Sequence, residues 1–523
     1  MNHLNTHVSR VTAAVRLCLA TMALGAAGAV TAATAADSTR MIVAFKPGTA
    51  ASIKALVSAA RGAVKHEIVG MDAMAIEIPA VALRALARNP NIAYLEEDVK
   101  RYPFALATDS KKPYLAGQQV PYGIKLVQAD QLGDSHAANR TVCIIDSGYE
   151  RAHEDLSANP ASGQYDRGTG WWYTDENHHG THVAGTIAAI NNNATGVVGV
   201  APNRQLKLHI VKVFGAEGWA YSSTLASAAR QCADAGANVI SMSLGGARPS
   251  RTELLAFDSL AAKGVLSVAA AGNDGNTAVS YPAGYRSVMM VGALDQNKAW
   301  ASFSQYNSKL EISAPGVAVL STVPMGSGAD SALSVGARTY APGAMDGSPK
   351  TAASAPLADF GVGDKVNAAM TGKVCLIARG AIDFATKVVN CQSSGGVGAV
   401  VYNNVAGGFG GTLGATATTI ASVTASDTEG TAMKVQLGQV ATLSVKPANY
   451  AYFDGTSMAT PHVAAVAALV WSYYPSCTGK QMRASLGKSA LDLGSPGRDD
   501  KFGYGLVQAK SAYDRIAKMG CGN

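Results

Sequence analysis

The sequence has few charged residues and few cysteines, and these shortages exclude several classes of protein. Charged residues make up 15% of the 523 residues and hydrophobic residues 48%, which is typical of a packed globular protein and not of a disordered chain. The net charge is only +7, and no basic run is long enough to bind nucleic acid. No Cys–His cluster has the spacing of a zinc site. What remains is a folded protein with a mildly basic, solvated surface.

The N-terminal region predicts export. Residues 17–30 are apolar, arginines without any acidic residue precede them, and residues 31–36 are small. This order is that of a secretory signal, and the apolar stretch is shorter than the ~20 residues of a membrane-spanning helix. We therefore expect residues 1–36 to be a signal peptide cleaved after Ala35 or Ala36. No other segment is apolar enough to cross a membrane, so we expect an extracellular or periplasmic protein without a membrane anchor.

Six of the seven cysteines lie after the predicted signal. An even number of cysteines in an oxidising compartment favours disulfides. Proximity in the sequence favours two pairs and leaves a third by elimination: Cys375–Cys391, Cys477–Cys521 and Cys143–Cys232. The alternative is that Cys143 is a free thiol buried in a strand.

The length of the chain and the changes of pattern along it predict more than one domain. Residues 37–104 alternate short strands with helices and predict a small α+β unit. Over residues 105–324, near-continuous apolar strands alternate with helices, which predicts a parallel sheet covered by helices on both faces. Residues 325–450 are rich in Gly, Ala, Ser and Thr and predict an inserted β-rich domain. The helical pattern resumes over residues 451–523.

Three segments carry residues suited to nucleophilic catalysis. Asp146 ends the apolar strand Val142-Cys-Ile-Ile-Asp, at the carboxyl edge where open α/β sheets collect functional groups. His179 begins the helix of His-Gly-Thr-His-Val-Ala-Gly185, and Ser457 begins that of Gly-Thr-Ser-Met-Ala-Thr-Pro461. Each is ordinary alone, since an acid often follows a strand and a serine at a helix start is usually an N-cap. Their combination is what carries information.

In the chain order Asp, His, Ser, the three segments resemble the subtilisin family of serine proteases over residues 118–513, apart from the insert. The resemblance implies that His179 is the general base for Ser457 and that Asp146 orients its imidazole. It also implies that Asn273, in Gly-Asn-Asp-Gly275, donates to the oxyanion beside the Ser457 N–H. We expect the neighbouring histidines to be structural: His178, His182 and His462.

The same resemblance implies a substrate groove for an extended peptide. Nine residues form its two edges and the S1 pocket for the residue before the cleaved bond (P1): Ser243, Leu244, Gly245, Gly218, Trp219, Ala220, Ala270, Gly272 and Ser280. The pocket walls are small and apolar, so we expect a preference for large apolar P1 residues. Asp274 at the rim leaves a basic P1 residue as an alternative. Trp219 and Tyr221 either shape the S4 pocket or are simply packed aromatics.

Two further segments, one before the catalytic domain and one inserted into it, resemble accessory domains of this family. Residues 37–104 resemble its inhibitory (I9-type) propeptide, and we expect self-cleavage between Tyr102 and Leu106, after Phe104. Residues 325–450 resemble a protease-associated domain, which either restricts or recruits protein substrates or is only a stabilising cover.

The resemblance also implies a structural Ca²⁺ site, because oxygen ligands from side chains and backbone suit this ion. Five residues match it: Gln118, Asp155, Asn193, Thr195 and Val197. The loop 190–196 is one residue longer than usual, which leaves the register of Asn192 against Asn193 open. We expect no cofactor for catalysis.

Two other functional classes fit the sequence less well than a protease. A binding module on an inactive protease scaffold loses at least one chemical residue, whereas all four are present here. Lipases and esterases carry Gly-x-Ser-x-Gly in the order Ser, Asp, His, but Ala459 replaces the second glycine and Asp146 precedes the serine. We therefore expect a secreted, monomeric serine endopeptidase made as a zymogen, with proteins and peptides as substrates and its own propeptide as inhibitor.

Overall fold

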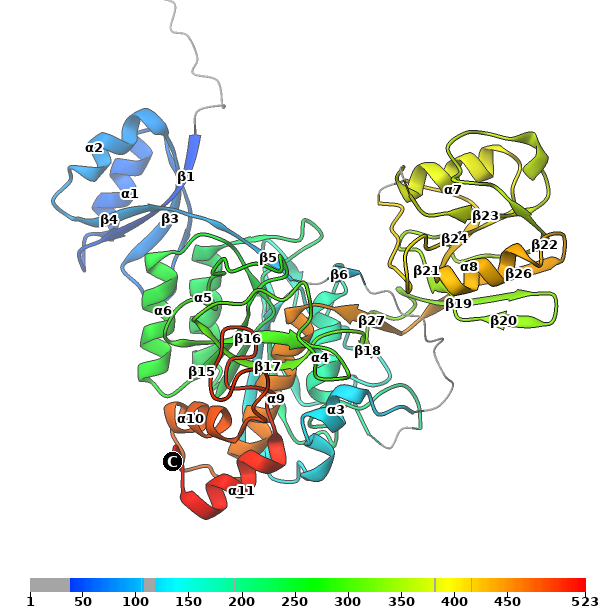
Figure 1. Cartoon of the computed structure of the whole chain (residues 1–523). Coiled ribbons are helices and arrows are strands. Elements are labelled where there is room, and N and C mark those ends of the chain that lie inside the picture. Colours follow the sequence, from blue (N-terminus) through cyan, green and yellow to red (C-terminus); the bar gives the residue numbers. More distant parts are fainter. Residues whose placement is uncertain (1–37, 105, 108–117, 192–193, 381, 415) are drawn as a thin grey trace, which may run out of the picture.

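The structure is a computed structural model, and it describes residues 38–104, 106–107, 118–191, 194–380, 382–414 and 416–523. The predicted signal peptide lies outside these residues. Figure 1 shows three bodies: a small N-terminal unit, a central α/β body and an insert that projects from the opposite side. Among the described helices, none combines the length and the hydrophobicity needed to span a bilayer.

The N-terminal unit is a four-stranded antiparallel sheet in the order β2-β3-β1-β4. Ile53 and Val57 of one helix pack on one sheet face against alternate residues such as Met74 and Ile76. The other face contacts the central body through Ile42. Its elements are β1 Ser38–Phe45, α1 Ala50–Ala59, β2 Ala63–Glu67, β3 Ala73–Pro79, α2 Leu83–Ala87 and β4 Ile92–Glu97.

The central body contains a seven-stranded sheet whose strand pairs are all parallel. The inner strands are mostly apolar and buried, because both faces of the sheet are covered. The fold class predicted from the sequence is therefore confirmed. In sheet order the strands are β17 Leu310–Pro315, β16 Val288–Leu294, β15 Leu266–Ala270, β13 Val239–Met242, β7 Thr141–Asp146, β11 Lys207–Lys212 and β8 Ala161–Gly163.

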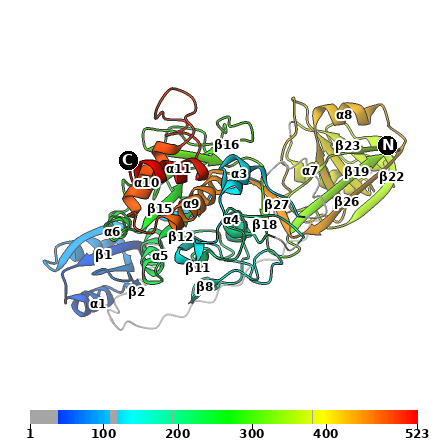
Figure 2. The ribbon, with the colours of Figure 1, turned by 90° about the horizontal axis from the view of Figure 1, so that it is seen from below.

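Helices cover the two faces of this sheet and form two separate cores. Along β7, Val142 and Ile144 belong to one core, and Cys143 and Ile145 belong to the other, as the two-residue period of a strand requires. The first core includes α4 and α9, and the second includes α5 and α6 (Figure 2). The helices are α4 His179–Ala188, α5 Ser222–Asp234, α6 Arg251–Ala262, α9 Thr456–Tyr473, α10 Gly479–Ser489 and α11 Ala509–Met519.

The insert is an excursion between two neighbouring strands of the central body. β18 (Val319–Thr322) and β27 (Tyr450–Asp454) flank it and pair antiparallel, so its two ends lie side by side. A domain joined in this way needs no change in the sheet that carries it. It folds as an eight-stranded sheet with two helices: β19 Gly328–Val335, β20 Arg338–Tyr340, β21 Gly343–Ala344, β22 Ala352–Asp359, β23 Val374–Ala378, α7 Phe384–Ser393, β24 Gly398–Tyr402, β25 Ala421–Ala425, α8 Asp427–Lys434 and β26 Val440–Ala448.

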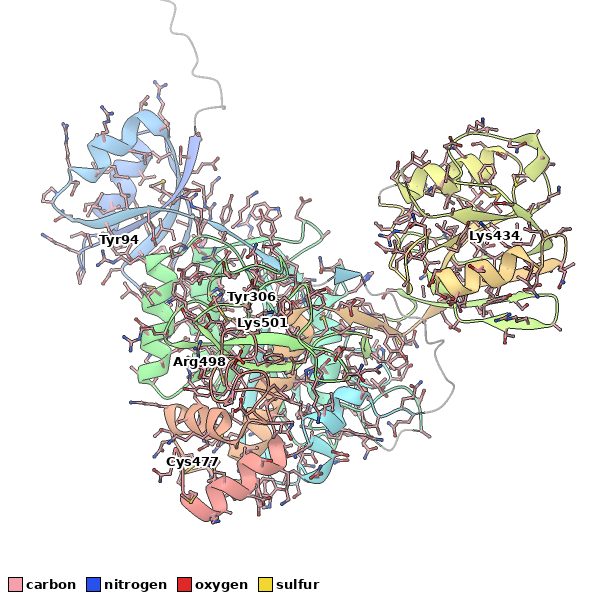
Figure 3. All side chains as sticks on the ribbon, viewed as in Figure 1. Tyr94, Tyr306, Lys434, Cys477, Arg498 and Lys501 are labelled. Atoms are coloured by element: carbon pink, nitrogen blue, oxygen red, sulfur yellow. A yellow bond between two sulfur atoms is a disulfide. The ribbon has the colours of Figure 1, made fainter. Side chains whose placement is uncertain are left out.

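Three disulfides link the six cysteines in the predicted pairs, the two that sequence proximity favours and the third left by elimination. Cys143–Cys232 joins β7 to α5, and Cys375–Cys391 joins β23 to α7 within the insert. Cys477–Cys521 ties the start of α10 to the chain end after α11 (Figure 3). Cys143 is therefore not a free thiol, and each disulfide closes a loop that the unfolded chain would otherwise leave open.

Candidate active site

Three side chains from separate elements converge at the carboxyl edge of the sheet. Asp146 ends β7, His179 begins α4 and Ser457 is the second residue of α9. Nδ1 of His179 lies 2.7 Å from Oδ1 of Asp146, and all three side chains are buried. Nε2 of His179 has no hydrogen-bond partner among the described residues. The Ser457 hydroxyl donates to the carbonyl oxygen of Ser243 at 2.9 Å instead of to His179.

A buried carboxylate holds the start of α4 in place. Asp175 accepts hydrogen bonds from the backbone N–H groups of Asn177, His178 and Thr181. An acid at this position accepts hydrogen bonds from N–H groups that have no intrahelical acceptor, and its negative charge interacts favourably with the positive end of the helix dipole. These hydrogen bonds fix the backbone around His179 at the N-terminus of α4. Sequence reasoning missed Asp175, although an acid shortly before a helix start is a recognisable capping signal.

The side chain of Asn273 is oriented toward a carbonyl group of the N-terminal segment. Its Nδ2 donates to the backbone oxygen of Phe104 at 3.0 Å. The other end of the amide is fixed, because its Oδ1 accepts from N and Oγ1 of Thr456 at 3.0 and 2.9 Å. Thr456 was also missed by sequence reasoning. Ser457 lies in the first turn of α9, where backbone N–H groups lack intrahelical acceptors.

The segment that ends at Phe104 lies in a groove as an added β-strand. β5 (Lys100–Pro103) pairs antiparallel with β12 (Ala220–Tyr221) on one side and with β14 (Leu244–Gly245) on the other. The N–H of Phe104 donates to Ser243 O at 3.2 Å. Gly218 and Trp219 directly precede β12. Both edges named from the sequence thus contact the same extended segment, by main-chain pairing.

The ring of Phe104 fills a pocket beside Gly245. A Cβ atom on Gly245 would lie 2.6 Å from this ring and 2.5 Å from Oγ of Ser280, so only glycine leaves room for the ring. Ser280 is buried, and Ala270 and Gly272 are buried at and just beyond the end of β15. The exposed Asp274 lines the same groove. Of the sequence-predicted groove residues, Gly245 and Ser280 thus line the same pocket as the Phe104 ring.

Comparison with known proteins now adds to this geometry. The model of the subtilase family (peptidase S8) matches residues 137–359 and 389–505, which is more than half of the chain. The chain belongs to the subtilase family. A PA domain model matches residues 339–433, within the insert, so this subtilase carries an inserted protease-associated domain.

Relatives and solved structures agree with this assignment. The alkaline protease of Alkalihalobacillus alcalophilus is 40% identical over 268 residues, which are 50% of this subtilase and 64% of that protein. This subtilase thus covers less than two thirds of that relative's length. Subtilisin DY of Bacillus licheniformis is 45% identical over 217 residues, 40% of this chain and 76% of that protein. The psychrophilic subtilisin-like protease Apa1 of Pseudoalteromonas sp. AS-11 has a TM-score of 0.61 and 42% identity, covering 78% of this chain and 100% of that one.

Two further histidines of this subtilase are buried near the triad but do not take part in its geometry. Nε2 of His182 lies 3.0 Å from Val319 O and 3.1 Å from Ala451 O. Burial lowers the pKa of His182 to about 3 and that of His462 to about 4. Both rings are therefore neutral at neutral pH and pack between helices and strands.

The residues expected to bind Ca²⁺ converge only in part within the described structure. Oδ2 of Asp155 accepts from the N–H of Val197 at 2.8 Å. Nε2 of Gln118 donates to Ile190 O at 2.9 Å, which places its amide against the same loop as Thr195. Asn193 lies outside the described residues. The described residues hold no group of three or more His, Cys, Asp or Glu side chains for a metal. Of the expected ligands, only Asp155 has a carboxylate, and the others would bind through amide or backbone oxygens. This set fits the hard cation Ca²⁺.

Proposed function

We propose that this subtilase is a serine endopeptidase that hydrolyses protein substrates through an acyl-enzyme. The observation that carries the proposal is the position of the Phe104 carbonyl, which accepts a hydrogen bond from Asn273 beside Ser457. A peptide carbonyl held by a fixed amide donor next to a serine hydroxyl is arranged for nucleophilic attack. We propose Asp146, His179, Ser457 and Asn273 as the catalytic residues.

The mechanism follows from the roles of these groups. Ser457 Oγ turns from Ser243 O toward Nε2 of His179, gives up its proton there and attacks the carbonyl carbon. Asp146 keeps Nδ1–H of the imidazole in place and stabilises the imidazolium. Asn273 Nδ2 and the Ser457 N–H stabilise the oxyanion. His179 then protonates the leaving amine, and water hydrolyses the acyl-enzyme with the same base.

Residues 37–104 act in this proposal as an inhibitory propeptide that the enzyme removes by cleavage after Phe104. Two carboxylates support the docking, because Glu96 accepts from the N–H groups of Arg251 and Thr252, and Asp98 accepts from the N–H of Ser223. These groups lie at the starts of α6 and α5, where anions are favourable. We propose that the processed enzyme is a secreted monomer. Phe104 in the S1 pocket supports a preference for large apolar P1 residues.

Digestion of casein by the processed protein tests this function. We expect hydrolysis that phenylmethylsulfonyl fluoride abolishes, because the reagent sulfonylates an activated serine. Mass spectrometry of the products should show Phe, Leu, Tyr or Met before most cleaved bonds. A triglyceride emulsion is the control substrate and should remain intact. If protein that has lost residues 37–104 leaves casein intact, the proposed function is contradicted and a binding module is favoured. If cleavage occurs only after small residues, or only after Lys and Arg, the P1 preference is contradicted.

We propose that a structural Ca²⁺ ion is held by oxygens of Gln118, Asp155, Asn193, Thr195 and Val197. The ion would tie the loop 190–197 to the segments that carry Gln118 and Asp155, and it takes no part in the chemistry.

Removal of calcium is expected to accelerate thermal inactivation of the processed enzyme. A ligand that binds only the folded state stabilises it by about 2.7 kcal/mol at a concentration of 100 Kd. The thermal midpoint is measured with Ca²⁺ and with chelator, on enzyme blocked by phenylmethylsulfonyl fluoride to prevent self-digestion. Asp155→Asn should remove the calcium dependence, and the surface variant Asp166→Asn should retain it. Equal midpoints with and without chelator in the wild type would count against the site.

We propose that the PA domain controls access of protein substrates to the part of the cleft that binds residues after the cleaved bond. The strand after the insert, β27, pairs with residues 106–107, which follow the proposed cleavage point. A cavity of about 400 Å³ lies between the insert and this strand, and Tyr452 and Phe453 are among its lining residues. Substrate residues beyond the cleaved bond therefore run toward the insert, which favours a role in selection over that of a stabilising cover.

A further inference from the structure

One buried ion pair lies in the groove, three residues before the Phe104 carbonyl group. Arg101 of β5 meets Glu253 of α6 with two hydrogen bonds: Nε to Oε1 at 3.0 Å and Nη2 to Oε2 at 2.7 Å. Their side chains are 1% and 0% exposed. A bidentate pair between a guanidinium and a carboxylate is the strongest kind of protein ion pair and the most selective in geometry.

The carboxylate belongs to the enzyme body and is aimed at the groove by its neighbours. Ser250 caps α6, and its Oγ accepts from Glu253 N at 3.2 Å. In a reciprocal capping box the glutamate side chain would return to the Ser250 N–H. Here the hydroxyl of Tyr285 accepts from that N–H at 2.8 Å and lies 2.7 Å from Oε2 of Glu253. Burial raises the pKa of Tyr285, so the phenol stays a neutral donor. Glu253 is thus free to face Arg101.

Arg101 occupies a defined position relative to the proposed cleavage point. It lies three residues before Phe104, which is the P4 position of a substrate cut after Phe104. β5 holds this register, because Arg101 pairs with Ala220, and Tyr102 pairs with Gly245. Arg101 is almost fully buried, whereas the next side chain, Tyr102, is 46% exposed. Arg101 is therefore held in a pocket and does not lie along the surface.

We infer that Glu253 and Tyr285 form an acidic S4 pocket that selects substrates with arginine at P4. The inference rests on the proposed function, since it assumes that substrates follow the path of residues 101–104. A guanidinium matches the two oxygens of Glu253, whereas the compact ammonium of lysine matches only one. A neutral P4 side chain leaves the carboxylate buried with Tyr285 as its remaining side-chain donor, and an unpaired buried charge is costly.

Trp219 and Tyr221, which either shape the S4 pocket or are packed aromatics, contact other residues of the N-terminal segment. The ring of Trp219 lies 3.9 Å from Nζ of Lys100, at P5, and Tyr221 packs against the guanidinium of Arg40 at 4.4 Å. A role of Trp219 and Tyr221 at S4 therefore stays a prediction, beside the alternative that they are packed aromatics. Trp219 directly precedes β12 and Tyr221 is its last residue, so both are neighbours of Ala220, which pairs with Arg101.

Peptide p-nitroanilides with the sequence of residues 101–104 test the inference on the processed enzyme. The set is acetyl-X-Tyr-Pro-Phe-p-nitroanilide with Arg, Lys, citrulline or Ala at X, and kcat/KM is measured for each. Citrulline is the matched neutral analogue of arginine, so it separates charge from shape. The ratio of Arg to Ala is also measured for Glu253→Gln and for Asp258→Asn, which removes an exposed carboxylate from the same helix.

We expect kcat/KM for the Arg peptide to exceed those for citrulline and Ala by at least about tenfold, because a site built for hydrogen bonds rejects analogues that lack them. The ratio should fall to about one to three in Glu253→Gln and stay unchanged in Asp258→Asn. Equal cleavage of the Arg, citrulline and Ala peptides by the wild type overturns the acidic S4 pocket and leaves the proposed function intact. If Glu253→Gln fails to mature, the wild-type ratio of Arg to citrulline decides. Cleavage of no peptide by enzyme free of its propeptide overturns the proposed function and the inference together.

Discussion

Ser457→Ala is expected to remain a single polypeptide that keeps residues 37–104 and has no measurable caseinolytic activity. The methyl group that replaces the hydroxyl can neither attack the carbonyl of Phe104 nor donate its proton to His179. Removal of the corresponding serine in a subtilisin lowers kcat by about 2 × 10⁶, and we expect a loss of this order. Gel mobility and N-terminal sequencing of the purified protein measure the processing, and casein release measures the activity.

The fold itself should tolerate this change. Ser457 is fully buried, but the hydroxyl makes a single hydrogen bond, to Ser243 O. Circular dichroism of Ser457→Ala should therefore match that of an uncut wild-type precursor. Ser259→Ala, on the exposed side of α6, is the control and should mature normally. Cleavage of Ser457→Ala between Phe104 and Ala105 at the wild-type rate would identify a different nucleophile.

Asn273→Ala is expected to slow self-processing by about 10² to 10³-fold, the range found when the equivalent amide is lost from a subtilisin. The amide contacts the Phe104 carbonyl directly, and that oxygen gains its negative charge only during attack. A donor at 3.0 Å therefore stabilises the transition state more than the ground state. Refolding is started by rapid dilution, and the conversion of precursor to processed enzyme is followed on gels. Its half-time measures the rate of cleavage within one molecule.

The partner of Asn273 offers a graded comparison. Thr456→Val removes the hydroxyl that donates to Oδ1 of Asn273 but keeps the backbone donor, so the amide stays less firmly oriented. We expect a smaller slowing, of about fivefold, since one hydrogen bond between neutral groups contributes about 1 kcal/mol. Asn297→Ala, on an exposed turn, is the control. An Asn273→Ala precursor that matures at the wild-type rate would show that the side chain does not act on the oxyanion.

The motif residues could be predicted from the sequence because each marks the end of a strand or the start of a helix. The strand that ends at Asp146 and the helices that begin at His179 and Ser457 are all recognisable from local pattern. The parallel sheet followed from apolar strands alternating with helices. Some elements were not predicted: β2 depends on pairing with β3, and the local caps that begin α6 and α10 were not recognised.

The fold class, the candidate triad and the inserted domain follow from the sequence alone, since they depend on residue type and order along the chain. The contacts by which Asp175 and Thr456 hold the candidate catalytic groups in place are visible only in the folded protein. The contact between Glu253 and Arg101 is likewise visible only there. The pattern Ser250-x-x-Glu253 is typical of a reciprocal capping box, and Ser250 does cap the helix, but Tyr285, distant in the chain, accepts from the Ser250 N–H in place of the Glu253 carboxylate. A contact between segments 152 residues apart has no local signal, because burial and pairing arise only when both segments are folded.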